Sequence, residues 1–176
     1  MKAWYCPGAF DIASGTWRDC SGNGNTATLS GSGLVELRNA GHGATNKVRA
    51  LSGTTSSVIA FGPVIKSEFT ICSVTRYTGG TKGRILQGST NWLHGHRGGN
   101  AGVAHYEGWK TAQQDNVSPD TDWVVSGSNA GSQAEAGERS RPWHRYEPPS
   151  MSTFRFLINW VSFSGKSLGN HAFGNT

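Results

Sequence analysis

Apolar and polar residues alternate along residues 68–77 with a period of two. One side of the pattern is formed by Phe69, Ile71, Ser73, Thr75 and Tyr77, and the other by Thr70, Cys72, Val74 and Arg76. Successive side chains of a β-strand point to opposite faces, and β-branched and aromatic residues favour strands. Residues 68–77 are therefore predicted to form the best-defined strand of the chain.

Shorter segments of the same character precede and follow this strand. They are residues 26–29, 48–51, 57–61, 92–96, 102–106 and 123–126. The sequence Thr-Gly-Gly-Thr at 78–81 is predicted to turn the chain. Residues 83–87 would then return as the second strand of an antiparallel hairpin that covers residues 69–87.

The composition supports the same fold class. The chain has 176 residues, of which 25 are glycine, and no segment carries a helical period. Such a glycine content disfavours long helices and suits short strands joined by tight turns. The length is typical of one β-sandwich domain. We therefore expect an all-β, two-sheet antiparallel sandwich.

The charge and the cysteines narrow the class of partner. The formal net charge is +5, but lysine and arginine are scattered singly, except for Arg139, Arg141 and Arg145. This distribution predicts a solvated basic surface and no nucleic-acid partner.

Three cysteines allow at most one disulfide. No apolar run is long enough for a signal peptide or a membrane span, so we expect a soluble chain, extracellular only if a larger exported protein contains it.

Five segments together resemble a known family. They are Trp17 and Asp19 with SGNGNTATLSG, ALSGTTSSVIAF at 50–61, EFTICSVTRY at 68–77, GRILQG at 83–88 and DWVVSGSNAGSQ at 122–133. In this order they are similar to landmarks of laminin-G-like (concanavalin A-like) jelly-roll domains, over residues 4–133. The resemblance implies two curved antiparallel sheets in an extracellular module that binds glycans or proteins, sometimes through calcium.

The resemblance ends after Gln133. Residues 134–149 show no strand alternation and contain several prolines, which are confined to edges and bulges of sheets. We therefore expect a sandwich over residues 1–133, an irregular segment over 134–149 and a divergent strand region over 150–176, in which residues 154–163 form a replacement strand. A shift of reading frame and true divergence both explain the departure. An incomplete sheet would leave an edge through which the domain could associate.

The densest polar and aromatic cluster lies at residues 91–97. On a strand, Trp92, His94 and His96 share one face, where a ligand could stack on the indole and hydrogen-bond to the imidazoles. A solvent-facing strand surface in which Trp92 partly covers the core is the favoured alternative. A second group, Tyr106, Glu107 and Trp109, offers sugar-stacking rings and a carboxylate, although packing of Trp109 in the core or in a loop is the favoured interpretation.

Metal binding has two candidate sites. Asp19 and Asn25 offer oxygen ligands for calcium, but the same residue types also stabilise turns through their own backbone, which is the favoured interpretation. His94, His96 and His105 could hold a transition metal. No cofactor is expected to be required, and calcium is the only one that the resemblance suggests.

The carboxylates argue against a glycoside hydrolase, which needs two of them at close range. The six glutamates are widely separated in the sequence, namely Glu36, Glu68, Glu107, Glu135, Glu138 and Glu147. We therefore expect a non-catalytic recognition module for glycan or protein ligands. The alternatives are a structural component that packs against another chain and a degenerate hydrolase.

Overall fold

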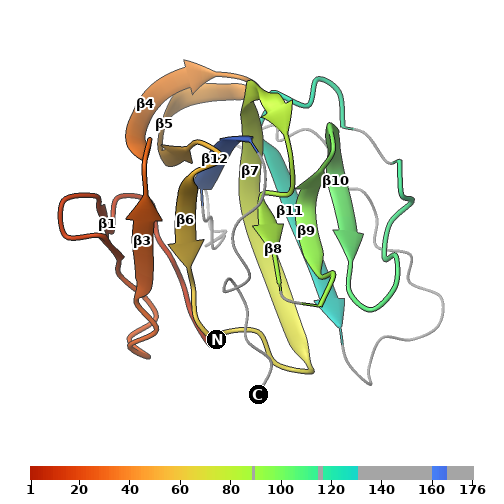
Figure 1. The fold of residues 1–176 in the computed structure, drawn as a ribbon, viewed down its shortest axis with the longest axis horizontal. Helices are drawn as coiled ribbons and strands as arrows, with labels where there is room; N and C mark the ends of the chain where they lie inside the picture. Colours follow the sequence, from red (N-terminus) through yellow and green to blue (C-terminus); the bar gives the residue numbers. More distant parts are fainter. Residues whose placement is uncertain (89, 115–116, 131–159, 166–176) are drawn as a thin grey trace.

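The computed structural model describes residues 1–88, 90–114, 117–130 and 160–165 (Figure 1). These residues form strands, turns and loops, and none of them lies in a helix. The predicted all-β class is thereby confirmed. Among the described residues there is consequently no helix of the length and apolarity that a membrane span requires.

The strands form three sheets. The largest has five strands in the order β11 (Val124–Ala130), β7 (Phe69–Lys82), β12 (Trp160–Gly165), β5 (Ala44–Gly53) and β4 (Val35–Gly41). A four-stranded sheet contains β1 (Phe10–Asp11), β2 (Thr16–Trp17), β3 (Ala27–Gly31) and β6 (Ser57–Ala60). A three-stranded sheet contains β10 (Asn100–His105), β9 (Leu93–Arg97) and β8 (Leu86–Gln87).

The main core gives the molecule a sandwich-like, two-layer character. It joins Leu51 and Tyr77 of the five-stranded sheet to Leu29 and Ile59 of the four-stranded sheet and to Leu86 of the three-stranded sheet. The larger sheet thus packs against both smaller ones. The predicted alternation of β7 is confirmed, because its Phe69, Ile71 and Tyr77 contact this main core while Val74 belongs to a different cluster.

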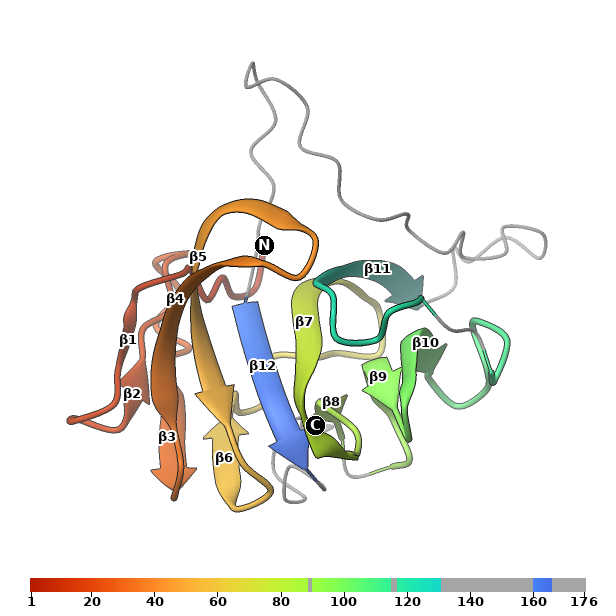
Figure 2. The ribbon, with the colours of Figure 1, turned by 90° about the horizontal axis from the view of Figure 1, so that it is seen from above.

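That second cluster lies on the opposite face of the five-stranded sheet. It contains Val48, Ala50, Val74 and Trp123. The β4–β5 hairpin curls over this face, as Figure 2 shows. At its tip the carbonyl of His42 accepts a hydrogen bond of 2.9 Å from the backbone N–H of Trp123. The hairpin therefore encloses a small second core, which explains why β7 is buried on both faces along Ser73–Tyr77.

The predicted hairpin over residues 69–87 is wrong. Strand β7 continues through the expected turn as far as Lys82 and pairs antiparallel with β11, whereas β8 pairs with β9. Tight hairpin turns need positive φ angles, and neither Gly79 nor Gly80 adopts one. The glycines therefore lie in extended backbone, and the pairing of the strand is decided by contacts distant in sequence.

Strand β4 was not predicted from the sequence. The segment around residues 40–44 is the tight turn of the β4–β5 hairpin, with His42 at a φ of 55°. In β4, an edge strand exposed along most of its length, apolar and polar residues alternate only over Val35–Arg38, which is a short run for identifying a half-buried strand. Glu36 forms ion pairs with Arg38 and with Arg49, and such charges on an edge discourage pairing with another chain.

Strand β12 occupies the position between β5 and β7 and is parallel to both. It overlaps the end of the predicted replacement strand at 154–163. The rest of that segment and the predicted irregular segment 134–149 lie outside the described residues.

Candidate binding site

The predicted cluster on β9 is a core element. Trp92, His94 and His96 share one face as expected, but that face points inward, and the three side chains are 7%, 1% and 0% exposed. Tyr106 is also buried, and its ring stacks on the indole of Trp92 with 5.0 Å between centroids and 23° between planes. The indole surface that the sequence offered to a ligand is thus covered by the protein itself.

The two histidines belong to a buried polar layer. Nδ1 of His96 lies 3.0 Å from Oγ1 of Thr75, and His94 hydrogen-bonds through Nδ1 to the hydroxyl of Tyr106 and through Nε2 to the carbonyl of Ser126. Burial lowers the pKa of His94 to about 4 and, with a further contribution from neighbouring His94, the pKa of His96 to about 3. Both imidazoles are therefore neutral near pH 7.

This layer is closed to substrates. A hydroxyl hydrogen-bonded to an imidazole is the arrangement of an activated nucleophile, and Thr75 with His96 has it. Both side chains are fully buried between the layers, however, so a substrate would reach Thr75 only if the layers separated. The three histidines proposed for a transition metal do not form such a site among the described residues, and Nδ1 of His105 lies 3.0 Å from the carbonyl of Asn91. Within the described part of the chain, no group of three or more His, Cys, Asp or Glu side chains is placed to hold a metal ion.

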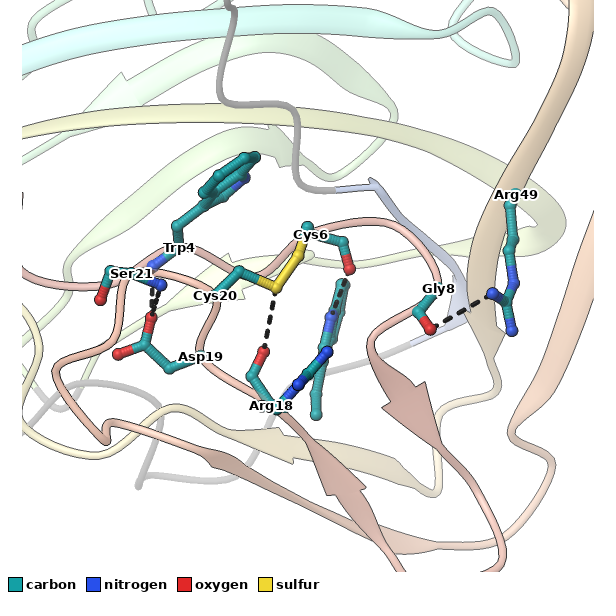
Figure 3. Close-up of a disulfide and its surroundings, with 9 residues drawn as sticks. Trp4, Cys6, Gly8, Arg18, Asp19, Cys20, Ser21 and Arg49 are labelled. Carbon is teal, nitrogen blue, oxygen red and sulfur yellow. Dashed lines mark hydrogen bonds between the residues drawn. A yellow bond between two sulfur atoms is a disulfide. The ribbon is translucent and has the colours of Figure 1, made fainter.

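The Asp19 loop is organised by backbone donors (Figure 3). The carboxylate accepts hydrogen bonds from the backbone N–H groups of Trp4 at 2.9 Å, Ser21 at 2.8 Å and Asn25 at 3.1 Å. Burial by itself raises the pKa of Asp19, but these bonds and one from the Ser21 side chain outweigh burial and hold that pKa well below its usual range. Calcium binding at Asp19 and Asn25 stays a prediction, and the ion would have to displace these donors.

A disulfide between Cys6 and Cys20 lies beside this loop, while Cys72 is a free thiol. The indole N–H of Trp17 donates to the carbonyl of Cys6 at 3.0 Å, so the backbone at the bridge is bonded to the fully buried Trp17. This agrees with the expected maximum of one bridge. The N-terminal segment is thereby fixed to the four-stranded sheet.

A partly exposed aromatic and basic surface lies at the three-stranded sheet and its connecting loops. We call it the Trp109 patch, and it consists of Arg84, Asn91, Arg97, His105 and Trp109. The Trp109 side chain is 38% exposed. The guanidinium carbon of Arg97 lies 5.5 Å from the centroid of its indole, and the His105 ring meets it edge-on at 5.2 Å.

A tight turn positions the indole. The backbone N–H of Tyr106 bonds to the carbonyl of Gly108 and that of Lys110 to the carbonyl of Ala104, so residue 109 returns beside His105. Glu107, another predicted site residue, is exposed in this turn with a φ of 56°. Of the predicted ligand-binding residues, only Trp109 and Glu107 are therefore accessible.

Within the described residues, the two arginines of the patch have no carboxylate partner. Burial lowers the pKa of Arg84, and the neighbouring charge of Arg97 lowers it further. Neither guanidinium forms an ion pair with a described carboxylate, whereas Arg38, Arg49 and Lys82 do. Asn91 joins the patch together, because its side-chain oxygen accepts from Arg84 at 2.5 Å and its carbonyl lies 3.0 Å from Nδ1 of His105.

The predicted cluster at 91–97 also contains Asn91 and Arg97, but the residues named for ligand binding were Trp92, His94 and His96, which are buried. The direction of the strand faces separates the two groups, and it depends on the elements that pack against β9.

No family model matches this sequence, and searches of curated proteins and of solved structures likewise give no match.

Proposed function

We propose that this domain is a non-catalytic recognition module that binds an acidic glycan through the Trp109 patch. The observation that carries the proposal is the exposed indole of Trp109 beside Arg84 and Arg97, two like charges without a carboxylate partner among the described residues. A bound anion between them would remove their mutual repulsion.

The chemistry of the patch suits a sugar with carboxylate or sulfate groups. The apolar C–H face of a pyranose stacks on an exposed indole. The planar guanidinium presents paired donors that match the geometry of an anionic oxygen group better than an ammonium does. Arg97 and Trp109 lie close enough for one monosaccharide to contact both.

Two further features support the proposal. Asn91 and the turn at 106–109 hold the patch in shape before a ligand arrives, which reduces the entropy lost on binding. The Cys6–Cys20 disulfide is of the kind that persists in oxidising surroundings, which suits an exported parent protein. We further infer that the sandwich is a jelly roll of the laminin-G-like kind.

The test is a titration of the oxidised full chain with a heparin-derived octasaccharide, followed by isothermal calorimetry. The fully desulfated, N-acetylated octasaccharide serves as the neutral ligand. Arg97→Gln and Trp109→Ala are each expected to weaken binding by about tenfold, since a charge-assisted contact or a stacked ring contributes on the order of 1 kcal/mol or more.

Arg18→Gln is the matched control. It removes the same charge from an exposed arginine of the Asp19 loop, outside the patch. Its affinity is expected to stay within about twofold of the parent, as for a distant charge screened by salt. If Arg18→Gln and Arg97→Gln weaken binding equally, or if the desulfated sugar binds as well as the sulfated one, the proposed site is wrong.

A further inference from the structure

A separate pocket of about 510 Å³ lies at the start of β7. Its walls come from the first five residues, from the connection between β6 and β7, and from residues 69–73 of β7 itself. Figure 1 shows the N-terminus beside this connection. The volume falls within the range of about 300–1,000 Å³ that is usual for small-molecule sites.

The lining of the pocket is mainly apolar. Its principal side chains are Trp4, Tyr5, Val64, Ile65, Phe69 and Ile71. Several of them are only partly covered, although they pack against the main core. Apolar surface left open beside a core favours an apolar occupant, because removing it from water is worth roughly 25 cal/mol per Å².

Within the described part of the chain, two polar atoms of the lining residues have no hydrogen-bond partner. Ser73 is 3% exposed, and within the described residues its Oγ makes no hydrogen bond. The same holds for the buried indole Nε1 of Trp4. An indole N–H only donates, and a serine hydroxyl can donate, so both atoms call for an acceptor. Buried polar groups are rarely left unsatisfied in native proteins, which makes two of them around one pocket informative.

We propose that this pocket binds a mainly apolar small molecule that carries one hydrogen-bond acceptor, such as a ketone. The apolar body contacts Ile65, Phe69 and Ile71, and the acceptor oxygen receives a hydrogen bond from Ser73 or from Trp4. This site is distinct from the Trp109 patch, and neither proposal depends on the other.

The experiment uses the naphthalene ketone prodan, whose emission shifts to the blue in apolar surroundings, and the oxidised full chain. Saturable binding of one prodan per chain with a blue shift is expected. Ile71→Trp and Val64→Trp each fill the space and are expected to weaken binding at least about tenfold, as overpacking of a formed site does. Two filling variants are used so that one misfolded variant does not decide the outcome, and melting curves identify any such variant.

Val35→Trp is the control, because it adds the same indole at a position on β4 that is 51% exposed and outside the pocket. Its affinity for prodan should equal that of the parent. The acceptor is tested by competition with 2-(dimethylamino)naphthalene, which lacks the ketone. The parent should prefer prodan by about threefold to tenfold, the value of one hydrogen bond, and Ser73→Ala and Trp4→Phe together should remove the preference.

Three results would overturn the proposal. They are the absence of saturable prodan binding, unchanged affinity in folded Ile71→Trp and Val64→Trp, and equal loss in Val35→Trp. A ketone preference that persists in the Ser73→Ala, Trp4→Phe double variant would overturn the assignment of the donors.

Discussion

The guanidinium of Arg76 lies over the indole of Trp123, with 5.1 Å between the guanidinium carbon and the ring centroid. Arg76 is 4% exposed and donates to the carbonyl of Thr121 at 3.2 Å. Burial lowers the pKa of this arginine, while the charge of Asp122 acts in the opposite direction. A cation is therefore held inside the second cluster, chiefly by an aromatic face and a carbonyl.

A double-mutant cycle measures this contact. Arg76→Met keeps the length of the side chain and removes its charge, and Trp123→Leu removes the aromatic face. We expect a coupling free energy of about 1–2 kcal/mol in urea unfolding, because a cation–π contact is stronger when it is shielded from water. The same cycle between Arg76 and Val48, which lies in that cluster but has no ring, should give a coupling close to zero.

The buried histidines predict a loss of stability in mild acid. In the unfolded chain a histidine titrates near pH 6.5, whereas the folded pKa values of His94 and His96 are about 4 and about 3. Between these limits the unfolded state binds more protons, so the free energy of unfolding falls as the pH decreases from 6.5 towards 4. The slope should reach about 1.4 kcal/mol per pH unit for each histidine.

Urea unfolding at intervals between pH 7.5 and pH 4.5 checks this slope. His96→Gln should reduce it, although the variant is less stable throughout. His42→Asn changes an exposed histidine in the β4–β5 turn, where asparagine tolerates the positive φ, and should leave the slope unaltered. A flat profile in the parent would show that the histidines are not protected from protonation.

Alanine substitutions at two glycines with similar φ angles distinguish the energy of backbone strain from that of a steric clash. Gly22 has a φ of 85° and Gly31 a φ of 80°, but a Cβ on Gly22 meets no atom within 4 Å, whereas one on Gly31 would lie 1.8 Å from the carbonyl oxygen of Ser56. Alanine at either position incurs the left-handed strain of about 1–2 kcal/mol. Gly31→Ala should lose about 1–3 kcal/mol more through overpacking between β3 and β6. Equal melting temperatures for the two variants would contradict this.

The disulfide is expected to stabilise the domain measurably. Cys6 and Cys20 are separated by 14 positions, so closing this loop constrains the unfolded chain by about 3 kcal/mol. Replacing both by serine should lower the unfolding free energy by about 2–3 kcal/mol. Cys72→Ser, which leaves the bridge intact, is the control for introducing a hydroxyl, and a loss as large as that of the double variant would argue against the assigned pairing.

The alternation of residues along the sequence predicted those features that depend on neighbouring residues. The fold class, the strand character of 69–77 and its two faces follow from alternation, and the structure confirms them. Partner choice does not follow from alternation. The pairing of β7 with β11 joins segments some fifty positions apart, and no rule about glycine pairs could indicate it.

In the candidate site, too, the sequence predicted which side chains share a face but not whether that face is buried. The sequence brought Trp92, His94 and His96 onto one face correctly, but only the packing of β9 against β7 and β11 determines that this face is buried. Trp109, by contrast, was expected to serve packing more often than binding, and it is 38% exposed. Arg84 adds to the charge of the patch. It lies outside the predicted cluster at 91–97 and is hydrogen-bonded to Asn91 of that cluster.

The position of β12 in the sheet delays completion of the five-stranded sheet during synthesis on the ribosome. Strands β5 and β7 are joined in their sheet only through β12, so they cannot be connected until residues 160–165 have been made. At about 5–20 residues per second, the nascent chain waits on the order of ten seconds after β7 has been synthesised. During this interval β5 and β7 each expose a row of unpaired backbone groups that a neighbouring nascent chain can recognise. Completion of the five-stranded sheet therefore waits for its last described strand, and we expect the yield of the domain in cells to depend on how well those two edges are shielded until then.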